Sequence, residues 1–246
     1  MSQWVSGKIT EVNWWTPSLF SIKVAADVAP FQAGQFTKLA MTIGDKRIAR
    51  AYSYVNAPND PVLEFYLTEV EGGKLTSGLA ELEVGASIDV EAKANGFLTI
   101  EESPQRDVLW MISSGTGIGP FLSILADGKV WDKYQKVILI HSARYNNDLT
   151  YQDFIQAHEK LFKQFTYLPL VTREEPEHGL QGRITELIKQ NAVARYFNLQ
   201  ALPENSHFMI CGNPDMVKET SQLLQSLGYK RHRRSEPGHI SVEQYW

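Results

Sequence analysis

A short apolar strand, a glycine-rich turn and an apolar helix follow one another over residues 108–125, and this succession constrains the fold more than any other stretch. The residues before the turn are apolar, as in a parallel strand covered on both faces. Gly115, Gly117 and Gly119 permit a sharp turn and a close approach of the backbone to a ligand. Pro120 suits the first turn of a helix, where an N–H is not needed. Because the free N–H groups of such a turn face an anion, the stretch predicts a nucleotide-phosphate site.

The turn departs from the common dinucleotide fingerprint, which has a glycine where this chain has Pro120. That fingerprint also places an acidic residue about twenty positions later for the ribose 2′-hydroxyl. Here the next predicted strand, 136–142, is followed by Ala143 and Arg144. An arginine at this place suits a 2′-phosphate and therefore predicts NADP rather than NAD. On the glycines alone, an ordinary strand–turn–helix with a solvent-facing arginine explains the pattern equally well.

Composition excludes several classes of protein. The chain has 246 residues, 43% hydrophobic and 21% charged, which is typical of a globular protein of one or two domains. A net charge of −4 argues against general nucleic-acid binding. One cysteine, Cys211, excludes an intrachain disulfide framework and favours a cytoplasmic location. We expect no membrane span and no signal peptide, because no apolar run reaches about 18 residues and the N-terminus lacks a basic-then-apolar layout.

The first hundred residues read as a small antiparallel barrel. Apolar and polar residues alternate in short runs separated by turn signals, as half-buried strands do. One short helix is expected near 76–82. The predicted strands lie at 4–12, 19–25, within 31–41, and at 48–55, 63–68 and 86–92.

A polar segment, 93–107, separates this region from the glycine-rich turn and predicts two domains, 1–100 and 101–246. The second domain alternates strands with helices, which is typical of a doubly wound parallel sheet. Its further strands are expected at 136–142, 165–172 and 206–211, and its further helices at 150–164, 184–191 and 214–227.

Two helix starts carry capping signals. Thr150 with Asp153 three residues later resembles a capping box for the helix at 150–164. Asn213 followed by Pro214 predicts an N-cap and a first helical residue, and Gly228 predicts the end of that helix.

Two segments of the predicted barrel carry further binding signals. On a strand, Arg50 and Tyr52 would share one face, with Ala51 and Ser53 on the other. The Gly72–Ser77 segment (GGKLTS) offers glycines, a cation and hydroxyls at a helix start, which is a second phosphate-binding pattern. Each segment alone also fits an ordinary strand or a capped turn.

Taken together and in order, these motifs resemble one family. Arg-x-Tyr-Ser at 50–53, Gly-Lys-Leu-Thr at 73–76, Gly-Thr-Gly-Ile-Gly-Pro at 115–120, Cys-Gly-Asn-Pro at 211–214 and a terminal Tyr-Trp resemble the short bacterial ferredoxin/flavodoxin–NADP reductases. The resemblance spans essentially the whole chain. It implies a two-domain α/β protein, with a six-stranded antiparallel barrel that binds FAD and a doubly wound parallel sheet that binds NADP(H).

The resemblance also implies roles toward FAD. Arg50 would pair with the pyrophosphate, Tyr52 would cover the isoalloxazine, and Ser53 would hydrogen-bond near the N5 atom. Tyr245 would lie on the other flavin face, and Trp246 would cover the adenine. The FAD-binding set is Arg50, Ala51, Tyr52, Ser53, Tyr66, Leu67, Thr68, Gly73, Lys74, Leu75, Thr76, Thr116, Tyr245 and Trp246.

For NADP, the resemblance places Arg144, Arg173 and Arg183 at the 2′-phosphate. Cys211 would lie beside the nicotinamide, with a steric and electronic role, and Glu243 would relay a proton or orient the nicotinamide. The NADP-binding set is Gly115, Thr116, Gly117, Pro120, Ala143, Arg144, Thr172, Arg173, Arg183 and Cys211; the catalytic set is Ser53, Cys211, Glu243 and Tyr245. No metal is expected.

The predicted activity is an FAD-dependent exchange of hydride with NADP(H) and of single electrons with ferredoxin or flavodoxin, by a monomer. The run Lys230–Arg234 (KRHRR) would steer these acidic carriers, although two of Arg231, Arg233 and Arg234 could instead serve the NADP phosphate. A free-flavin reductase of the same architecture and a non-catalytic NADP-binding redox sensor remain alternatives.

Overall fold

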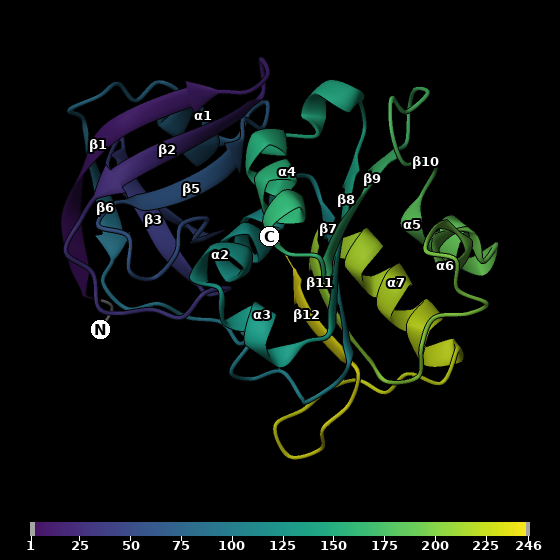
Figure 1. Ribbon diagram of the computed structural model, residues 1–246. Coiled ribbons are helices and arrows are strands. Elements are labelled where there is room, and N and C mark those ends of the chain that lie inside the picture. Colours follow the sequence, from purple (N-terminus) through teal and green to yellow (C-terminus); the bar gives the residue numbers. More distant parts are fainter. Residues whose placement is uncertain (1–2, 245–246) are drawn as a thin grey trace. The chain divides into compact units, whose positions relative to one another are not determined.

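The computed structural model describes residues 3–244, and these form two compact units (Figure 1). The first unit contains the chain up to Ile100 together with helix α2 (Gly119–Asp127). The second contains Glu101–Ile118 and the chain from Gly128 onward. Within residues 3–244, no helix is long and apolar enough to cross a membrane.

The first unit is built on six antiparallel strands, as the sequence predicts. In sheet order these are β4 (Lys46–Ser53), β3 (Phe36–Ile43), β6 (Ser87–Glu91), β1 (Trp4–Trp14), β2 (Leu19–Ala25) and β5 (Leu63–Thr68). Every neighbouring pair is antiparallel. The short helix α1 (Lys74–Ala80) lies between β5 and β6 in the chain.

The two edge strands of this sheet meet and close it toward a barrel. Just beyond β4, Tyr54 forms an antiparallel bridge with Phe65 of β5, and the Val55 N–H donates to the Glu64 carbonyl at 2.9 Å. The Tyr54 ring stacks on Phe31, with 3.8 Å between ring centroids, inside a core of aliphatic and aromatic side chains. Closure removes exposed edges that would otherwise pair with other chains.

The second unit is built on a six-stranded parallel sheet. Its order is β10 (Leu180–Gln181), β9 (Phe165–Val171), β8 (Lys136–Ala143), β7 (Val108–Ser114), β11 (Ser206–Gly212) and β12 (Ile240–Gln244). All five pairings are parallel, so the carboxyl ends of the strands share one edge. The prediction of a doubly wound sheet is confirmed.

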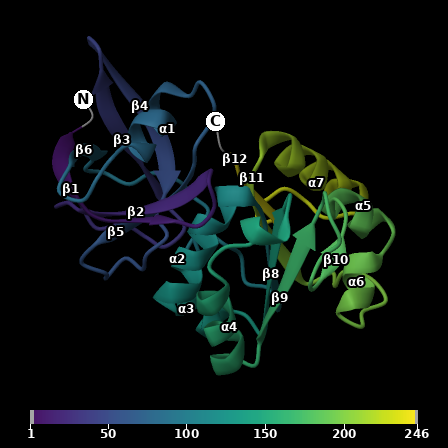
Figure 2. The same cartoon turned by 90° about the horizontal axis from the view of Figure 1, so that it is seen from above.

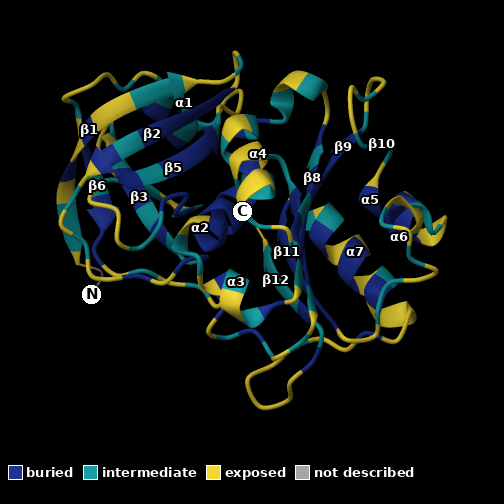
Figure 3. Cartoon of the chain, viewed as in Figure 1, coloured by how far each residue is buried: buried dark blue, intermediate teal, exposed yellow. Residues whose placement is uncertain are grey.

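Helices cover both faces of this sheet, and its strands are the buried centre of the unit (Figures 2 and 3). On one face, α5 (Ile184–Lys189), α6 (Ala192–Tyr196) and α7 (Pro214–Ser226) pack on the sheet through a cluster of aliphatic and aromatic side chains. The other face carries α3 (Lys129–Lys133) and α4 (Gln152–Leu161). Trp131 of α3 stacks on Phe162, the residue that follows α4, with 4.0 Å between ring centroids.

The two capping predictions have opposite outcomes. The Asn213 side chain accepts hydrogen bonds from the N–H groups of Asp215 and Met216 at 3.0 and 3.2 Å, so this N-cap is confirmed. The capping box at Thr150 is wrong: α4 begins at Gln152, after Tyr151 in the left-handed region (φ 59°), and no side chain caps it.

Several elements are shorter than sequence patterns can reveal. The sequence did not indicate α3, α6, β10 or β12, which have between two and five residues each. Segments this short carry little periodicity, and packing against neighbours decides their conformation.

Replacing the confirmed cap should destabilise α7. We expect Asn213→Ala to lower the free energy of unfolding in urea by about 1 kcal/mol, because two helix N–H groups lose their acceptor. Lys218→Ala, at an exposed position of the same helix, should change the free energy of unfolding by no more than the error of the measurement. Equal losses in both variants would contradict the capping role.

Candidate nucleotide and redox site

The glycine-rich turn joins β7 to α2 through a single 3₁₀ turn, η1 (Gly115–Ile118). Gly115 has φ +53°, in the left-handed region that favours glycine. A Cβ on Gly117 would lie 2.6 Å from the Cys211 carbonyl oxygen and 2.6 Å from Gly212 Cα. The turn therefore packs directly against the backbone at the end of β11, and only glycine fits at position 117.

A second contact fastens the same two turns together. The Asn213 N–H donates to Ser114 Oγ at 3.0 Å, which links the end of β7 to the start of α7. Gly212 has φ +130°, and a Cβ there would meet Ser114 Oγ at 2.5 Å. Sequence reasoning did not single out Ser114 or Gly212. Their positions, directly before the first glycine and inside the Cys-Gly-Asn-Pro motif, were the available signal.

Three arginines gather at the carboxyl edge of the sheet. Arg144 follows β8, Arg173 follows β9, and Arg183 follows the short strand β10 as the N-cap of α5. The loops are directly bonded: the Arg173 N–H donates to the Arg144 carbonyl at 3.0 Å. All three residues are exposed, and within residues 3–244 none of their guanidinium groups forms an ion pair.

Neighbouring residues hold these loops in shape. The Thr172 hydroxyl donates to the Ala143 carbonyl at 3.2 Å, so two residues of the predicted NADP set bind each other. Asn146 uses its Nδ2 to bind Glu174 Oε1 at 2.8 Å and the Glu175 carbonyl at 2.9 Å. These contacts order the arginine-bearing loops without using the arginines.

Two members of the predicted catalytic set lie side by side in the sheet. Cys211 of β11 is in register with Glu243 of β12 and, on its other side, with Ser113 of β7. Cys211 is 0% exposed, whereas Glu243 is half-buried. In a parallel sheet, residues in register project toward the same face, so the thiol and the carboxylate are neighbours. Thr116 is half-buried in η1, and Pro120 is buried in the first turn of α2.

In the first unit, the predicted flavin strand is β4. Arg50 is exposed, and its Nη1 donates to the Ala49 carbonyl at 2.8 Å. Tyr52 is half-buried against the barrel core, and burial raises the pKa of its phenol to about 12 despite the opposing effect of Arg50. Ser53 is buried at the end of the strand, while Ala51 is exposed.

The β5 residues divide between the two faces of the barrel wall. Leu67 lies in the core with Phe65, so its side chain faces inward. Tyr66 has the opposite orientation by the period of two, yet is only 4% exposed. Thr68 is half-buried at the strand end.

The Gly-Lys-Leu-Thr segment begins helix α1. Gly73 precedes the helix, and a Cβ there would lie 2.5 Å from Thr76 Oγ1. Thr76 Oγ1 accepts from the Val70 N–H at 3.2 Å and donates to the Gly73 carbonyl at 3.2 Å. Lys74 is exposed and Leu75 is buried in the barrel core.

Two predicted residues, Tyr245 and Trp246, lie outside the described residues. Between residues 3 and 244, no group of three or more histidine, cysteine or acidic side chains is arranged to hold a metal.

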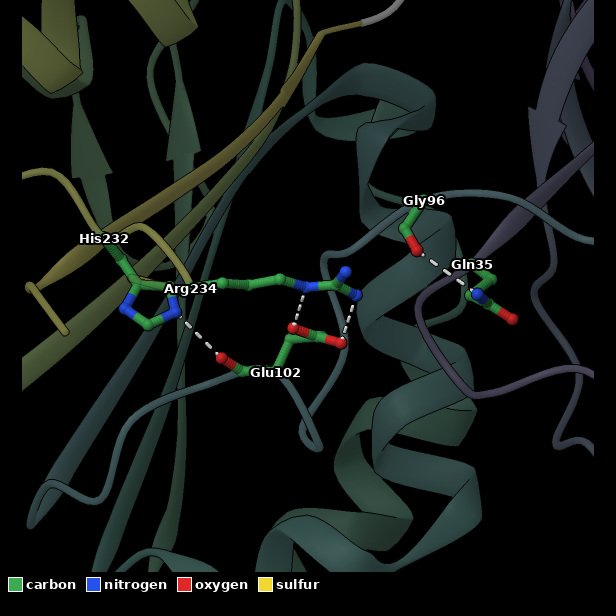
Figure 4. Close-up of polar contacts among 5 residues, drawn as sticks. All are labelled: Gln35, Gly96, Glu102, His232 and Arg234. Carbon is green, nitrogen blue, oxygen red and sulfur yellow. Dashed lines mark hydrogen bonds and ion pairs between the residues drawn. The ribbon is translucent and has the colours of Figure 1, made fainter. Parts of the chain in front are cut away.

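The cationic run Lys230–Arg234 lies in a loop, residues 230–239, that precedes β12. We call this segment the basic loop; it is the yellow loop below β12 in Figure 1. Arg234 forms two hydrogen bonds with the Glu102 carboxylate, and His232 Nε2 donates to the Glu102 carbonyl at 2.9 Å (Figure 4). Arg234 therefore forms an ion pair within the protein. Lys230, Arg231 and Arg233 are exposed and form no ion pair with any described residue.

The position of the basic loop separates it from the three arginines. It enters β12 at the amino edge of the sheet, where Ile240 pairs with Phe208, whereas Arg144 and Arg173 follow strands at the carboxyl edge. The two edges are about 20 Å apart along the strands. The basic loop and the three arginines therefore lie at opposite edges of the same sheet.

Comparison with known proteins identifies both domains. Residues 9–97 match the oxidoreductase FAD-binding domain, and residues 111–222 match the oxidoreductase NAD-binding domain. A flavodoxin/ferredoxin–NADP reductase of Escherichia coli (strain K12) is 45% identical over 248 residues, covering 100% of both chains. The chain belongs to the flavodoxin/ferredoxin–NADP reductase family. The resemblance indicated by the motifs is confirmed.

A second relative and a solved structure match the chain over nearly its full length. A ferredoxin–NADP reductase of Azotobacter vinelandii is 33% identical, with 96% of this chain and 95% of the relative covered. A crystal structure of a ferredoxin NADP⁺ reductase from Neisseria gonorrhoeae with bound FAD and NADP superposes with a TM-score of 0.93, at 35% identity and full coverage of both chains. The family fold therefore extends over residues 3–244.

Proposed function

We propose that this protein is an FAD-dependent reductase that exchanges hydride with NADP(H) and single electrons with a ferredoxin or flavodoxin. The observation that carries the proposal is the full-length match, at 45% identity, to a relative named flavodoxin/ferredoxin–NADP reductase. The match favours this activity over a free-flavin reductase and over a non-catalytic sensor.

The barrel residues fit a flavin. A flavin needs flat apolar walls and a few fixed polar groups, because the redox chemistry belongs to the cofactor. Tyr52, half-buried against the barrel core, supplies such a wall. Arg50 is exposed and forms no ion pair with a described residue, so its guanidinium can meet a phosphate. Gly73 fits the tight start of α1, where a Cβ would lie 2.5 Å from Thr76 Oγ1 and 2.9 Å from the Val70 carbonyl oxygen.

The carboxyl edge of the parallel sheet fits NADP better than NAD. Arg144, Arg173 and Arg183 follow three adjacent strands and have no counter-ion among the described residues. Three guanidinium groups at one edge suit a dianionic phosphate, which only NADP carries on its ribose. This is the place where open α/β sheets bind ligands.

Bound FAD would accept a hydride from NADPH and pass the electrons on singly. The chain's own residues would bind and orient the flavin and the nicotinamide ring. Ser53 would offer its hydroxyl to the flavin. Cys211 would set the depth at which the nicotinamide ring rests, and Glu243 beside it would orient the ring or hold a proton. No histidine base is in register with Cys211, so we assign the thiol no nucleophilic role.

The basic loop supports steering of an acidic carrier. Lys230, Arg231 and Arg233 concentrate positive charge in a chain whose net charge is −4. Such a patch accelerates encounter with an acidic partner and is screened by salt. We also propose a monomer, and a reducing compartment such as the cytoplasm, consistent with the one buried cysteine.

An anaerobic absorbance titration tests the proposal as a whole. The purified protein should be yellow, and NADPH should bleach the flavin band at far lower concentrations than NADH does. A protein without a flavin band, even after incubation with FAD, would overturn the reductase assignment.

Removing one guanidinium should reveal the phosphate specificity. We expect Arg144→Ala to raise the KM for NADPH about tenfold or more, because a charge-assisted hydrogen bond to phosphate is lost, and to leave the KM for NADH nearly unchanged. Arg195→Ala, exposed on α6, is the control. Comparable losses with both nucleotides would contradict a 2′-phosphate role.

Charge reversal in the basic loop should weaken carrier encounter. We expect Arg231→Glu with Arg233→Glu to raise the KM for flavodoxin at least several-fold at low ionic strength, with the difference fading as salt is added. NADPH-dependent reduction of ferricyanide reports the remaining machinery and should be unchanged. Lys163→Glu with Lys218→Glu makes the same change in net charge at exposed sites elsewhere and controls for total charge. An equal effect in that control would refute a local docking role.

A further inference from the structure

A histidine is buried in the centre of the parallel sheet, next to the glycine-rich turn. His141 lies on β8, is 0% exposed, and is in register with Ser113 of β7 and Pro169 of β9. It follows four aliphatic residues, Val137–Ile140, that are all fully buried. A polar ring at such a place is costly unless its hydrogen bonds are made.

One ring nitrogen of His141 binds the turn. Its Nε2 lies 3.1 Å from the carbonyl oxygen of Gly115, the first residue of η1. A carbonyl only accepts, so Nε2 carries the proton and donates. Burial lowers the pKa of His141 to about 4, which keeps the ring neutral and this tautomer in place at neutral pH.

The other ring nitrogen of His141 forms no hydrogen bond with a described residue. Nδ1 is buried and has no hydrogen-bond partner among the described residues. A buried polar atom without a partner costs about 1–3 kcal/mol. The chain therefore keeps at this position a ring that makes a single hydrogen bond, to the turn, where an aliphatic side chain would suit the strand better.

That bond fits only one direction of the peptide group between Gly115 and Thr116. In a trans peptide the C=O and the following N–H point in opposite directions, and the described backbone contains no cis bond. With the Gly115 carbonyl held toward His141, the Thr116 N–H is turned away from the ring. Gly115 has φ +53° and no side chain to restrict it, so the bond from His141 adds a restraint on this peptide beside the bonds within η1.

His141 complements the contacts that reach the turn from β11. On that side, Gly117 packs against the Cys211 carbonyl, and Ser114 accepts the Asn213 N–H. On the β8 side, the bond from His141 to Gly115 is the corresponding restraint. The first residues of the turn are therefore held from both neighbouring strands.

We propose that His141 is a positioning residue for NADP(H), which holds the Gly115 peptide so that the turn between β7 and α2 is preorganised for the nucleotide. This inference rests on the proposed function, because it assumes that the turn binds NADP(H). His141 itself does not touch the reacting atoms.

The test is the dissociation constant of NADP⁺, measured by calorimetry on the FAD-loaded protein. We expect His141→Leu to raise this dissociation constant about five- to tenfold, because the turn loses one hydrogen bond that orients it before NADP⁺ binds. The KM for NADPH should rise in parallel, with kcat changed less. His141→Gln, whose amide nitrogen can reach the same carbonyl, should recover most of the affinity. Amide hydrogen exchange at Thr116 and Gly117 should quicken in His141→Leu and not in His141→Gln.

His207 provides the matched control. It is also a 0% exposed histidine on a strand of the same sheet, and its Nδ1 likewise lacks a partner among the described residues. Its Nε2 contacts Ser241 Oγ at 3.2 Å, near the amino edge and away from the turn. His207→Leu should change stability but not NADP⁺ affinity.

The outcomes separate the two proposals. Wild-type protein that carries FAD but binds no NADP⁺ contradicts the proposed function. Wild-type protein that binds NADP⁺, with His141→Leu binding equally well or with His207→Leu impaired equally, overturns the positioning role alone. If His141→Leu does not fold, His141→Asn, too short to reach Gly115, takes its place with the same expected loss.

Discussion

The arrangement of the glycine-rich turn depends on a close contact between two turns at the carboxyl edge of the parallel sheet. Gly117 rests on the Cys211 carbonyl and Gly212 Cα, at distances that leave no room for a Cβ. The proposed roles of the glycine-rich turn and of Cys211 depend on this approach. It sets where the turn ends and α2 begins, and it keeps the end of β11 next to the turn. A larger side chain at either glycine would force the two backbones apart.

Positively charged side chains lie at both edges of the parallel sheet, in two separate groups. The carboxyl edge carries Arg144, Arg173 and Arg183 with no counter-ion among the described residues, while their loops are held by uncharged contacts such as Thr172 to Ala143. At the amino edge, Glu102 binds Arg234 and leaves the other cations of the basic loop exposed. A chain that is acidic overall can thus present two cationic surfaces for two different anionic partners.

Sequence reasoning succeeded where local chemistry determines structure. Alternation located the six barrel strands, and Asn213 with Pro214 located the start of α7 because an N-cap acts within one turn of helix. It failed at Thr150, where the chain takes a left-handed residue, Tyr151, before α4 begins. It also missed β12, a strand defined by its pairing with β11 rather than by its own pattern.

The sequence by itself determined the order of motifs, the glycines of the turn and the family, since these depend on residue types at fixed spacing. Only the tertiary structure decided which residues meet. It placed Cys211 beside Glu243, set the basic loop at the edge opposite Arg144, and brought His141 to the Gly115 carbonyl. These contacts join residues that are 26 or more positions apart. No local periodicity encodes them, because strand order and register are fixed by the packing of the whole sheet.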